Sequence, residues 1–350
     1  MPISESDVLE SLKVVMDPDL HRDIVTLGFV KDVVVDLPSV SLRIDLTTPA
    51  CPVKDELKAQ AEEAVLGLDG VDKVSIEMTA TVRQRNQQGE DLISGVKHVI
   101  AIASGKGGVG KSTVTVNLAL ALSETGAKVG ILDADVYGPS IPLMLGAQKE
   151  KPFTESQKIL PVMKYGVHTM SLGYLLDEDN AVLWRGPMVA GTVRQLLADV
   201  EWGELDYLLV DLPPGTGDAP MSLAQLVPLT GVVIVSTPHN VAANIAGKAV
   251  QLFRRLNSPV LGVIENMGPY MENGQEKRMF SGMTGVALAE HISVPYLGSI
   301  PFDPVVSQSG DEGVPAVIGY PDTAQAEAFR HIAGSVAQQA SIRAMASQSV

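Results

Sequence analysis

The chain has 350 residues, of which 45% are hydrophobic and 19% are charged, a composition typical of folded globular proteins that excludes a disordered chain. Its formal net charge of -15 disfavours binding to nucleic acid and to anionic membranes, because both are negatively charged. The single cysteine, Cys51, excludes an intrachain disulfide and favours a reducing compartment. Because neither a signal peptide nor a long apolar run is found, we expect a cytoplasmic protein.

Residues 1–82 predict a small α+β domain. Its expected elements are a helix, two paired strands, a second helix and a last strand, at residues 4–15, 29–37, 40–46, from 52 onward, and 71–78. Cys51 precedes Pro52, the expected first residue of the second helix, so we expect the helix field to lower the pKa of its thiol. The alternative is a small buried apolar residue.

Residues 83–95 form a polar linker, because the stretch 83–91 is rich in glutamine and has no apolar side chain to bury. From residue 96 to residue 350, short apolar runs alternate with helix-length stretches. This pattern predicts an α/β domain with a doubly wound, mostly parallel sheet covered by helices on both faces. Ligands of such sheets bind beyond the carboxyl ends of the strands.

The sequence GKGGVGKS at residues 105–112 follows an expected strand and precedes an apolar helix, which is the setting of a phosphate-binding loop. The glycines allow successive backbone N–H groups to face one anion at the helix N-terminus. The alternative is a glycine-rich turn with a solvated lysine. The expected nucleotide contacts are Gly105, Lys106, Gly107, Gly108, Val109, Gly110, Lys111, Ser112 and Thr113, with Lys111 on the terminal phosphates and the Ser112 hydroxyl on Mg²⁺.

The second lysine of the loop, Lys106, resembles that of the deviant P-loop ATPases, which include nitrogenase iron protein, MinD and the Mrp/ApbC proteins. The resemblance implies a homodimer in which Lys106 reaches the nucleotide of the partner subunit and places positive charge on the transferring phosphoryl group. It also implies that Asp135 orients the attacking water. The alternative for Lys106 is a solvated surface residue.

The same resemblance assigns further residues at strand ends. Asp133 would support the Mg²⁺ shell, and Asp211 would hold a Mg²⁺-bound water. Gly215 would donate its N–H group to the γ-phosphate. Asn266 would contact the base, and Pro301, in the stretch 300–304, would close the base pocket. Adenine is expected because no Asn-Lys or Thr-Lys pair of a guanine-reading turn occurs. Asp133 and Asn266 have plain turn residues as their alternative.

A narrower resemblance, to the Mrp/ApbC proteins, rests on motifs spread over nearly the whole chain. They are WGELDYLLVDLPPGTGD, DADVYGPSIP and WRGPM at residues 202–218, 133–142 and 184–188. Residues 17–30 and 47–57 are similar to the small SufT and PaaD proteins. The resemblance implies an ATP-binding and slowly ATP-hydrolysing carrier of iron-sulfur clusters, with maturation partners and apo-protein clients.

One departure from that family concerns the cluster ligands. Family members usually carry a C-x-x-C pair that the segment 268–282 lacks, and Met271 and Met279 are poor replacements. Cys51 is left as the candidate iron ligand, with two thiolates in a dimer. The alternatives are a nucleotide-switched scaffold and a positioning ATPase of the MinD or partition type. MinD needs a basic amphipathic C-terminal helix to bind lipid, whereas the stretch 322–350 of this chain has only Arg330 and Arg343 as fixed cations.

Overall fold

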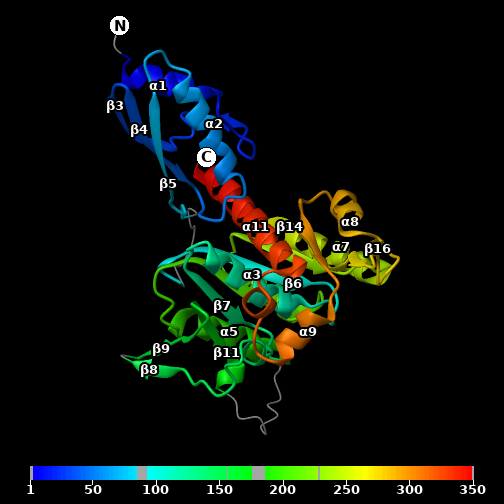
Figure 1. The fold of residues 1–350 in the computed structure, drawn as a ribbon. Helices are drawn as coiled ribbons and strands as arrows, with labels where there is room; N and C mark the ends of the chain where they lie inside the picture. Colours follow the sequence, from blue (N-terminus) through cyan, green and yellow to red (C-terminus); the bar gives the residue numbers. More distant parts are fainter. Residues whose placement is uncertain (1–2, 85–92, 156, 176–185, 228, 349–350) are drawn as a thin grey trace. The chain divides into compact units, whose positions relative to one another are not determined.

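The chain is described here from a computed structural model, which covers residues 3–84, 93–155, 157–175, 186–227 and 229–348 (Figure 1). It divides into two compact units, residues 1–83 with 341–350, and residues 84–340. We predicted that 341–350 belong to the larger domain. The described part of this stretch, residues 341–348, groups with the smaller unit instead, because Met345 packs against its core. Within the described residues, no helix combines the length and the apolar character needed to cross a membrane.

The smaller unit packs two helices on one three-stranded sheet of order β3-β4-β5. Strands β3 and β4 are antiparallel, whereas β4 and β5 are parallel and joined by α2. Apolar side chains of the sheet and of both helices form its core, which includes Val8, Phe29 and Leu57. Its elements are α1 (Glu5–Ser11), the 3-10 helix η1 (Leu12–Val14), β1 (Met16–Asp17), β2 (Arg22–Asp23), β3 (Val30–Asp36), β4 (Ser39–Leu46), α2 (Lys54–Leu66) and β5 (Lys73–Ala80).

The larger unit is built on one eight-stranded sheet, with two short hairpins beside it. Its elements are β6 (Val96–Ser104), α3 (Lys111–Glu124), β7 (Val129–Asp133), α4 (Ile141–Met144), β8 (Phe153–Glu155), β9 (Lys158–Leu160), β10 (Val162–Lys164), β11 (Val167–Ser171), η2 (Leu172–Tyr174), α5 (Gly186–Asp199), β12 (Leu205–Asp211), α6 (Asp218–Leu226), β13 (Gly231–Ser236), α7 (Asn240–Arg255), β14 (Val260–Gly268), β15 (Tyr270–Glu272), β16 (Gln275–Lys277), α8 (Gly285–Ile292), β17 (Tyr296–Pro301), α9 (Pro304–Asp311), α10 (Ala316–Gly319) and α11 (Ala324–Gln348) as far as Ala340.

The strand order β10-β11-β7-β12-β6-β13-β14-β17 places β6 inside the sheet, between β12 and β13. Every neighbouring pair is parallel except β10 with β11. The predicted doubly wound, mostly parallel sheet is therefore confirmed. The chain proceeds from β6 to one side and later returns to the other side, so β6 ends at a switch point, where such sheets bind ligands.

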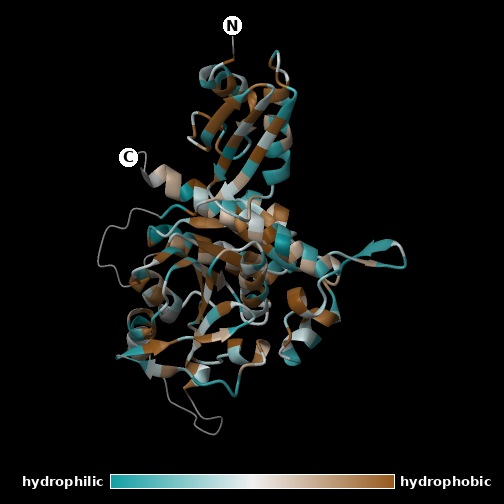
Figure 2. Ribbon diagram, turned by 60° about the vertical axis from the view of Figure 1, so that its left-hand side comes forward, coloured by the Kyte–Doolittle hydropathy of each residue, from teal (hydrophilic) through white to brown (hydrophobic). Residues whose placement is uncertain are grey.

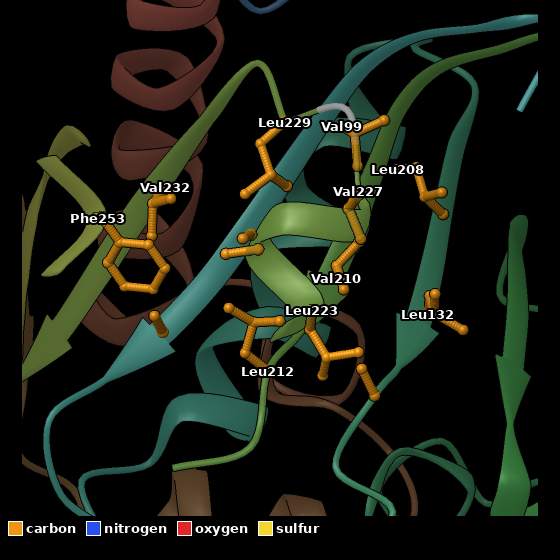
Figure 3. Close-up of a cluster of buried hydrophobic side chains, with 14 of the residues drawn as sticks. Val99, Leu132, Leu208, Val210, Leu212, Leu223, Val227, Leu229, Val232 and Phe253 are labelled. Atoms are coloured by element: carbon orange, nitrogen blue, oxygen red, sulfur yellow. The ribbon is translucent and has the colours of Figure 1, made fainter. Parts of the chain in front are cut away.

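Near-continuous apolar strands give this sheet a core on both faces. In Figure 2 the strands inside the larger unit carry the colours of hydrophobic residues. Figure 3 shows how Leu223 of α6, Val227 just after this helix and Phe253 of α7 gather with Val210 and Val232 of the sheet. Helix α3 is buried along most of its length. Such burial is expected for a helix that is apolar on all sides, and it holds the N-terminus of α3 at the end of β6.

Candidate functional site

The phosphate-binding loop runs from the end of β6 to the first residue of α3, as predicted. Gly108 and Gly110 have φ angles of 78° and 81°, the left-handed region that glycine adopts without strain. A side chain on Gly105 would lie 2.6 Å from the backbone of Ile245 and 2.7 Å from that of Ala246, so only glycine fits there. The loop is thereby packed closely against α7.

Behind the loop, one buried carboxylate binds three side chains of α3. Asp211, at the end of β12, lies 2.7 Å from the Lys111 Nζ atom. It also accepts hydrogen bonds from the Ser112 and Thr115 hydroxyls at 2.6 and 2.7 Å. Lys111 is 6% exposed and Asp211 is 0% exposed, so the ion pair is shielded from water. The site therefore brings together three groups predicted from the sequence, Lys111, Ser112 and Asp211.

Thr115 was missed in the sequence analysis. It lies four residues after Lys111 on α3, and its hydroxyl bonds both the Lys111 carbonyl and Asp211. Residues four apart on a helix share one face, so this spacing could have identified it. Its role is to hold the carboxylate in place from the side away from the loop.

Asp133 and Asp135, the acidic residues at the end of β7, differ from each other in burial. Asp133 is buried and accepts hydrogen bonds from the Ser171 hydroxyl at 2.9 Å and from the Ile141 N–H at 3.3 Å. Burial, and next the charge of Asp211, raise the pKa of the Asp133 carboxyl. Asp135 is partly exposed, and burial also raises its pKa, while the charge of Lys111 opposes the shift. Asp135 is therefore the more accessible carboxylate at this edge of the sheet.

The N–H group of Gly215, which we predicted to reach a γ-phosphate, is bound to the protein itself. Its N–H group donates to the Ser104 carbonyl at 2.9 Å. The residue has a φ of 96°, which is typical of glycine in a turn. A phosphate contact would therefore require this peptide to leave Ser104.

A pocket of about 400 Å³ lies beside Gly110 at the end of the loop and is lined by both residues that we predicted to contact the base. It is lined by Thr113, Asn266 and Pro301, together with Gly110, Met267, Phe302, Asp303, Pro304, Val306 and Ser307. The Asn266 side chain is buried, and its Nδ2 atom donates to the Val109 carbonyl at 2.8 Å. Asn266 thus joins the end of β14 to the phosphate-binding loop.

We expect Gly110→Ala to weaken ATP binding at least about tenfold, because a methyl group there would contact Asn266 Nδ2 and displace it from Val109, a loss of about 1.4 kcal/mol or more. The matched control is Gly126→Ala. Gly126 also has a positive φ, of 93°, but nothing lies within 4 Å of the added methyl group. Both variants should lose about 1–2 kcal/mol of stability through the backbone. Calorimetric titration with ATP distinguishes them, and equal ATP affinity in the two variants would contradict the contact.

The expectation for Cys51 is wrong in one respect. Helix α2 begins at Lys54 with Val53 as its cap, not at Pro52, so Cys51 is too far from the first turn to benefit from its field. The thiol is partly buried against the core of the smaller unit. Burial is the main cause that raises its pKa to about 11. Cys51 is therefore a protonated thiol at neutral pH rather than a thiolate.

This placement predicts slow alkylation of Cys51. With a pKa of about 11 instead of 9.0, the thiolate fraction at pH 7.5 falls about 100-fold. Because the folded pKa is raised, reactivity should increase with pH up to about 11. Mass spectrometry after iodoacetamide treatment measures the rate, and the urea-unfolded chain is the control that should react at the ordinary rate. A folded-state midpoint below pH 8 would contradict the burial of this thiol.

Oxygen donors at the loop suit a hard divalent cation. The Ser112 hydroxyl and the Asp211 carboxylate lie 2.6 Å apart, and both are ligand types that Mg²⁺ prefers. Among the residues that the structure describes, no group of three or more His, Cys, Asp and Glu side chains could hold a metal ion. The Ser112 and Asp211 oxygens fit a Mg²⁺ ion that is shared with phosphate oxygens.

The WRGPM motif and the predicted linker are covered only in part. Trp184 and Arg185 of the WRGPM motif, and linker residues 85–92, lie outside the described residues. Lys106 lies inside them, and its side chain is exposed. Its backbone carbonyl accepts a hydrogen bond from Ser104 at 3.1 Å, so the loop is fixed while the lysine side chain faces outward.

Known proteins resemble this chain over both of its parts. Residues 95–337 match the family described as NUBPL iron-transfer P-loop NTPase, and residues 5–78 match the family described as iron-sulfur cluster assembly protein. The iron-sulfur cluster carrier protein of Synechocystis sp. is 42% identical over 97% of this chain and 98% of its own length. That of Deinococcus radiodurans is 44% identical, over 97% and 96%.

Solved structures agree with this assignment. The nucleotide-binding protein of Archaeoglobus fulgidus, in complex with ADP, is 40% identical with a TM-score of 0.57, over 63% of this chain and 87% of that chain. MinD of Pyrococcus furiosus is 24% identical with a TM-score of 0.52, over 68% and 98%, which shows a shared fold. The predicted resemblance to the Mrp/ApbC carriers is confirmed. The chain therefore belongs to the NUBPL-type iron-transfer P-loop NTPases, alongside the bacterial iron-sulfur cluster carrier proteins.

Proposed function

We propose that this protein is a homodimeric, Mg²⁺-dependent ATPase that hydrolyses ATP slowly and carries iron-sulfur clusters to apo-proteins. The observation that carries the ATPase part is the buried Asp211 carboxylate, which binds Lys111, Ser112 and Thr115 directly behind a phosphate-binding loop. The relatives named iron-sulfur cluster carrier proteins support the transfer part.

The residues of the site have separate roles in this proposal. Ser112 and a water held by Asp211 would bind Mg²⁺, which neutralises charge on the β- and γ-phosphates. The incoming phosphates would compete with Asp211 for Lys111. Asp135, the more accessible carboxylate, would orient the attacking water. Asp133 would support the metal shell from within, because its hydrogen bonds to Ser171 and Ile141 fix its position.

The base in this proposal is adenine, because the sequence lacks the Asn-Lys or Thr-Lys pair of a guanine-reading turn. Asn266 is held by the Val109 carbonyl and offers its remaining amide groups to a base edge, while Pro301 and Phe302 supply apolar walls. Gly215 would leave the Ser104 carbonyl to reach a γ-phosphate. This exchange would let the end of β12 respond to the difference between ATP and ADP.

Exposed apolar side chains support a dimer beside the loop. Val241, Met279 and Met283 are 50%, 48% and 37% exposed. Met283 is joined to Asn240, at the start of α7, by a 2.9 Å hydrogen bond. The next turn of α7 packs against Gly105. Because exposed apolar groups of this kind mark interaction surfaces, a second copy covering them would lie close to the exposed Lys106 side chain.

The cluster would be cargo, and its ligands need a second source. The chain has one cysteine, so a homodimer offers two thiolates, while a [4Fe–4S] cluster uses four ligands. The remaining ligands would come from glutathione or from the partner protein. Because coordination to iron deprotonates a thiol, a protonated Cys51 can still become a ligand.

A nucleotide-switched scaffold without cluster chemistry is the second candidate, favoured by the absence of a C-x-x-C pair. The two functions differ in an anaerobic reconstitution with iron and sulfide. A carrier takes up both and transfers them to an apo-ferredoxin. A scaffold takes up neither and binds its partners in a way that depends on ATP but not on Cys51.

A further inference from the structure

A second, larger pocket lies next to the base pocket in the same unit. Its volume is about 750 Å³, and residues 301–304 form a wall of both pockets. The other walls are the β15–β16 hairpin and the first residues of α11, including Tyr270 and Gln325. We call this pocket the hairpin groove. No residue of the phosphate-binding loop lines it, so the nucleotide contacts described above leave it unexplained.

The Gln325 side chain is the unusual feature of this groove. Gln325 is the second residue of α11 and is only 6% exposed, yet its amide makes no hydrogen bond to another described residue. An amide offers two donors and an acceptor. The side-chain nitrogen and oxygen of Gln325 are not among the buried polar atoms that lack a partner, so the small exposed area of Gln325 includes its amide. A ligand in the groove would replace water on this amide.

The charges of the groove select the kind of ligand. Its lining residues include Glu272, Glu276 and Asp303 and no lysine or arginine. One Asp303 oxygen accepts from the Val305 N–H at 2.8 Å, which leaves the other oxygen for a ligand. Glu272 pairs with Lys277, and Glu276 lies 3.3 Å from Arg278. Both pairs are exposed, and such pairs contribute about 0–1 kcal/mol, so a cationic ligand can compete for the carboxylates. An anionic ligand such as a second nucleotide is disfavoured.

The apolar part of the groove suits flat or cyclic side chains. The rings of Tyr270 and Phe302 lie 5.7 Å apart between centroids at an angle of 60°. Three prolines also line the groove, at positions 269, 301 and 304. Aromatic-lined grooves are one kind of surface that binds extended peptides, and here a side-chain amide beside the rings offers hydrogen bonds to a peptide bond.

We propose that the hairpin groove binds an extended segment of a partner protein that carries basic and apolar side chains. Gln325 would hydrogen-bond the peptide backbone, the aromatic and proline walls would receive the apolar side chains, and the three carboxylates would attract the basic ones. The inference names a class of partner protein, and its biological role rests on the proposed carrier function. Peptide binding is measured without any cluster, so peptide binding and the carrier function can fail separately.

The test uses the full chain with saturating Mg-ADP, so that the base pocket stays in one state. Fluorescence polarisation compares three labelled octapeptides. The first alternates arginine with leucine and proline, the second has glutamate for arginine, and the third has serine and glycine for leucine and proline. We expect a Kd on the order of 100 µM for the first peptide. The other two should bind at least about tenfold more weakly.

Gln325→Leu tests the central contact, with Gln338→Leu on the same helix as the matched control, since Gln338 does not line the groove. Gln325→Leu should weaken binding of the first peptide at least about fivefold. It should leave ADP affinity and the melting temperature unchanged, because the Gln325 amide makes no hydrogen bond to another described residue that the substitution could break. A clear loss of melting temperature would show that the amide has a partner inside the protein and would overturn the proposal.

Three further results would also overturn it. The first is equal binding of the basic and acidic peptides. The second is equal peptide binding by wild type and Gln325→Leu. The third is competition by free arginine amide as effective as that of the whole octapeptide, which would show a site for a small cation instead of a peptide.

Discussion

Lys111→Ala is expected to abolish ATP binding at concentrations that saturate the wild type and to destabilise the nucleotide-free protein. The first effect follows from the loss of a charged donor to the phosphates. The second follows from the structure, because Asp211 is 0% exposed and its only cationic partner among the described residues is Lys111. Removing one member of such a buried pair costs about 3–5 kcal/mol. Calorimetric ATP titration and chemical denaturation measure the two effects.

A double variant separates the loss of ATP binding from the loss of stability. Lys111→Ala with Asp211→Asn removes both charges, so stability should recover by at least about 2 kcal/mol. ATP binding should stay lost, because neither the lysine nor the Mg²⁺ carboxylate is present. Lys128→Ala, an exposed lysine in the same unit, is the control and should change neither quantity. ATP binding by Lys111→Ala with near wild-type affinity would show that the loop is not the nucleotide site.

Lys106→Ala is expected to reduce ATP hydrolysis about 1,000-fold or more while ATP affinity changes less than about threefold. The reason is that Lys106 is exposed and makes no contact with Asp211, so it does not hold the loop together in one subunit. In a dimer, its positive charge would stabilise the transition state of hydrolysis at the nucleotide of the partner subunit. Steady-state phosphate release and ATP titration measure the rate and the affinity.

Mixing two inactive variants tests the cross-dimer role. A heterodimer of Lys106→Ala and Lys111→Ala has one complete site, because the first subunit binds ATP and the second supplies Lys106. An equimolar mixture should recover about a quarter of the wild-type rate if subunits exchange freely in a two-fold dimer. A mixture that stays inactive although the subunits exchange, or a normal rate in Lys106→Ala alone, would remove the assignment.

Features that local sequence motifs determine were easier to predict than features that depend on long-range packing. The loop at residues 105–112 and the strand end at Asp211 were predictable because glycine spacing and a following helix impose one geometry on the backbone. Parallel strands end at the same edge of the sheet, which brought Asp133, Asp211 and Asn266 to the expected place.

Features that depend on distant contacts were missed. Residues 341–348 group with the smaller unit through Met345, and no local pattern in an alanine-rich helix indicates that contact. The start of α2 at Lys54 rather than Pro52 reversed the expected pKa shift of Cys51, because burial outweighs a helix field that is two residues too far away. The bond of Gly215 to Ser104 likewise depends on how two strands lie side by side.

The most direct test of a cluster carrier is transfer itself. The protein is reconstituted anaerobically with iron and sulfide, separated from unbound metal, and mixed with an apo-ferredoxin whose cluster is followed by its visible absorption. We predict that wild type transfers a cluster, that Cys51→Ser takes up little iron, and that Lys128→Ala behaves as wild type. A wild-type protein that takes up neither iron nor sulfide and does not convert the apo-ferredoxin would contradict the carrier function.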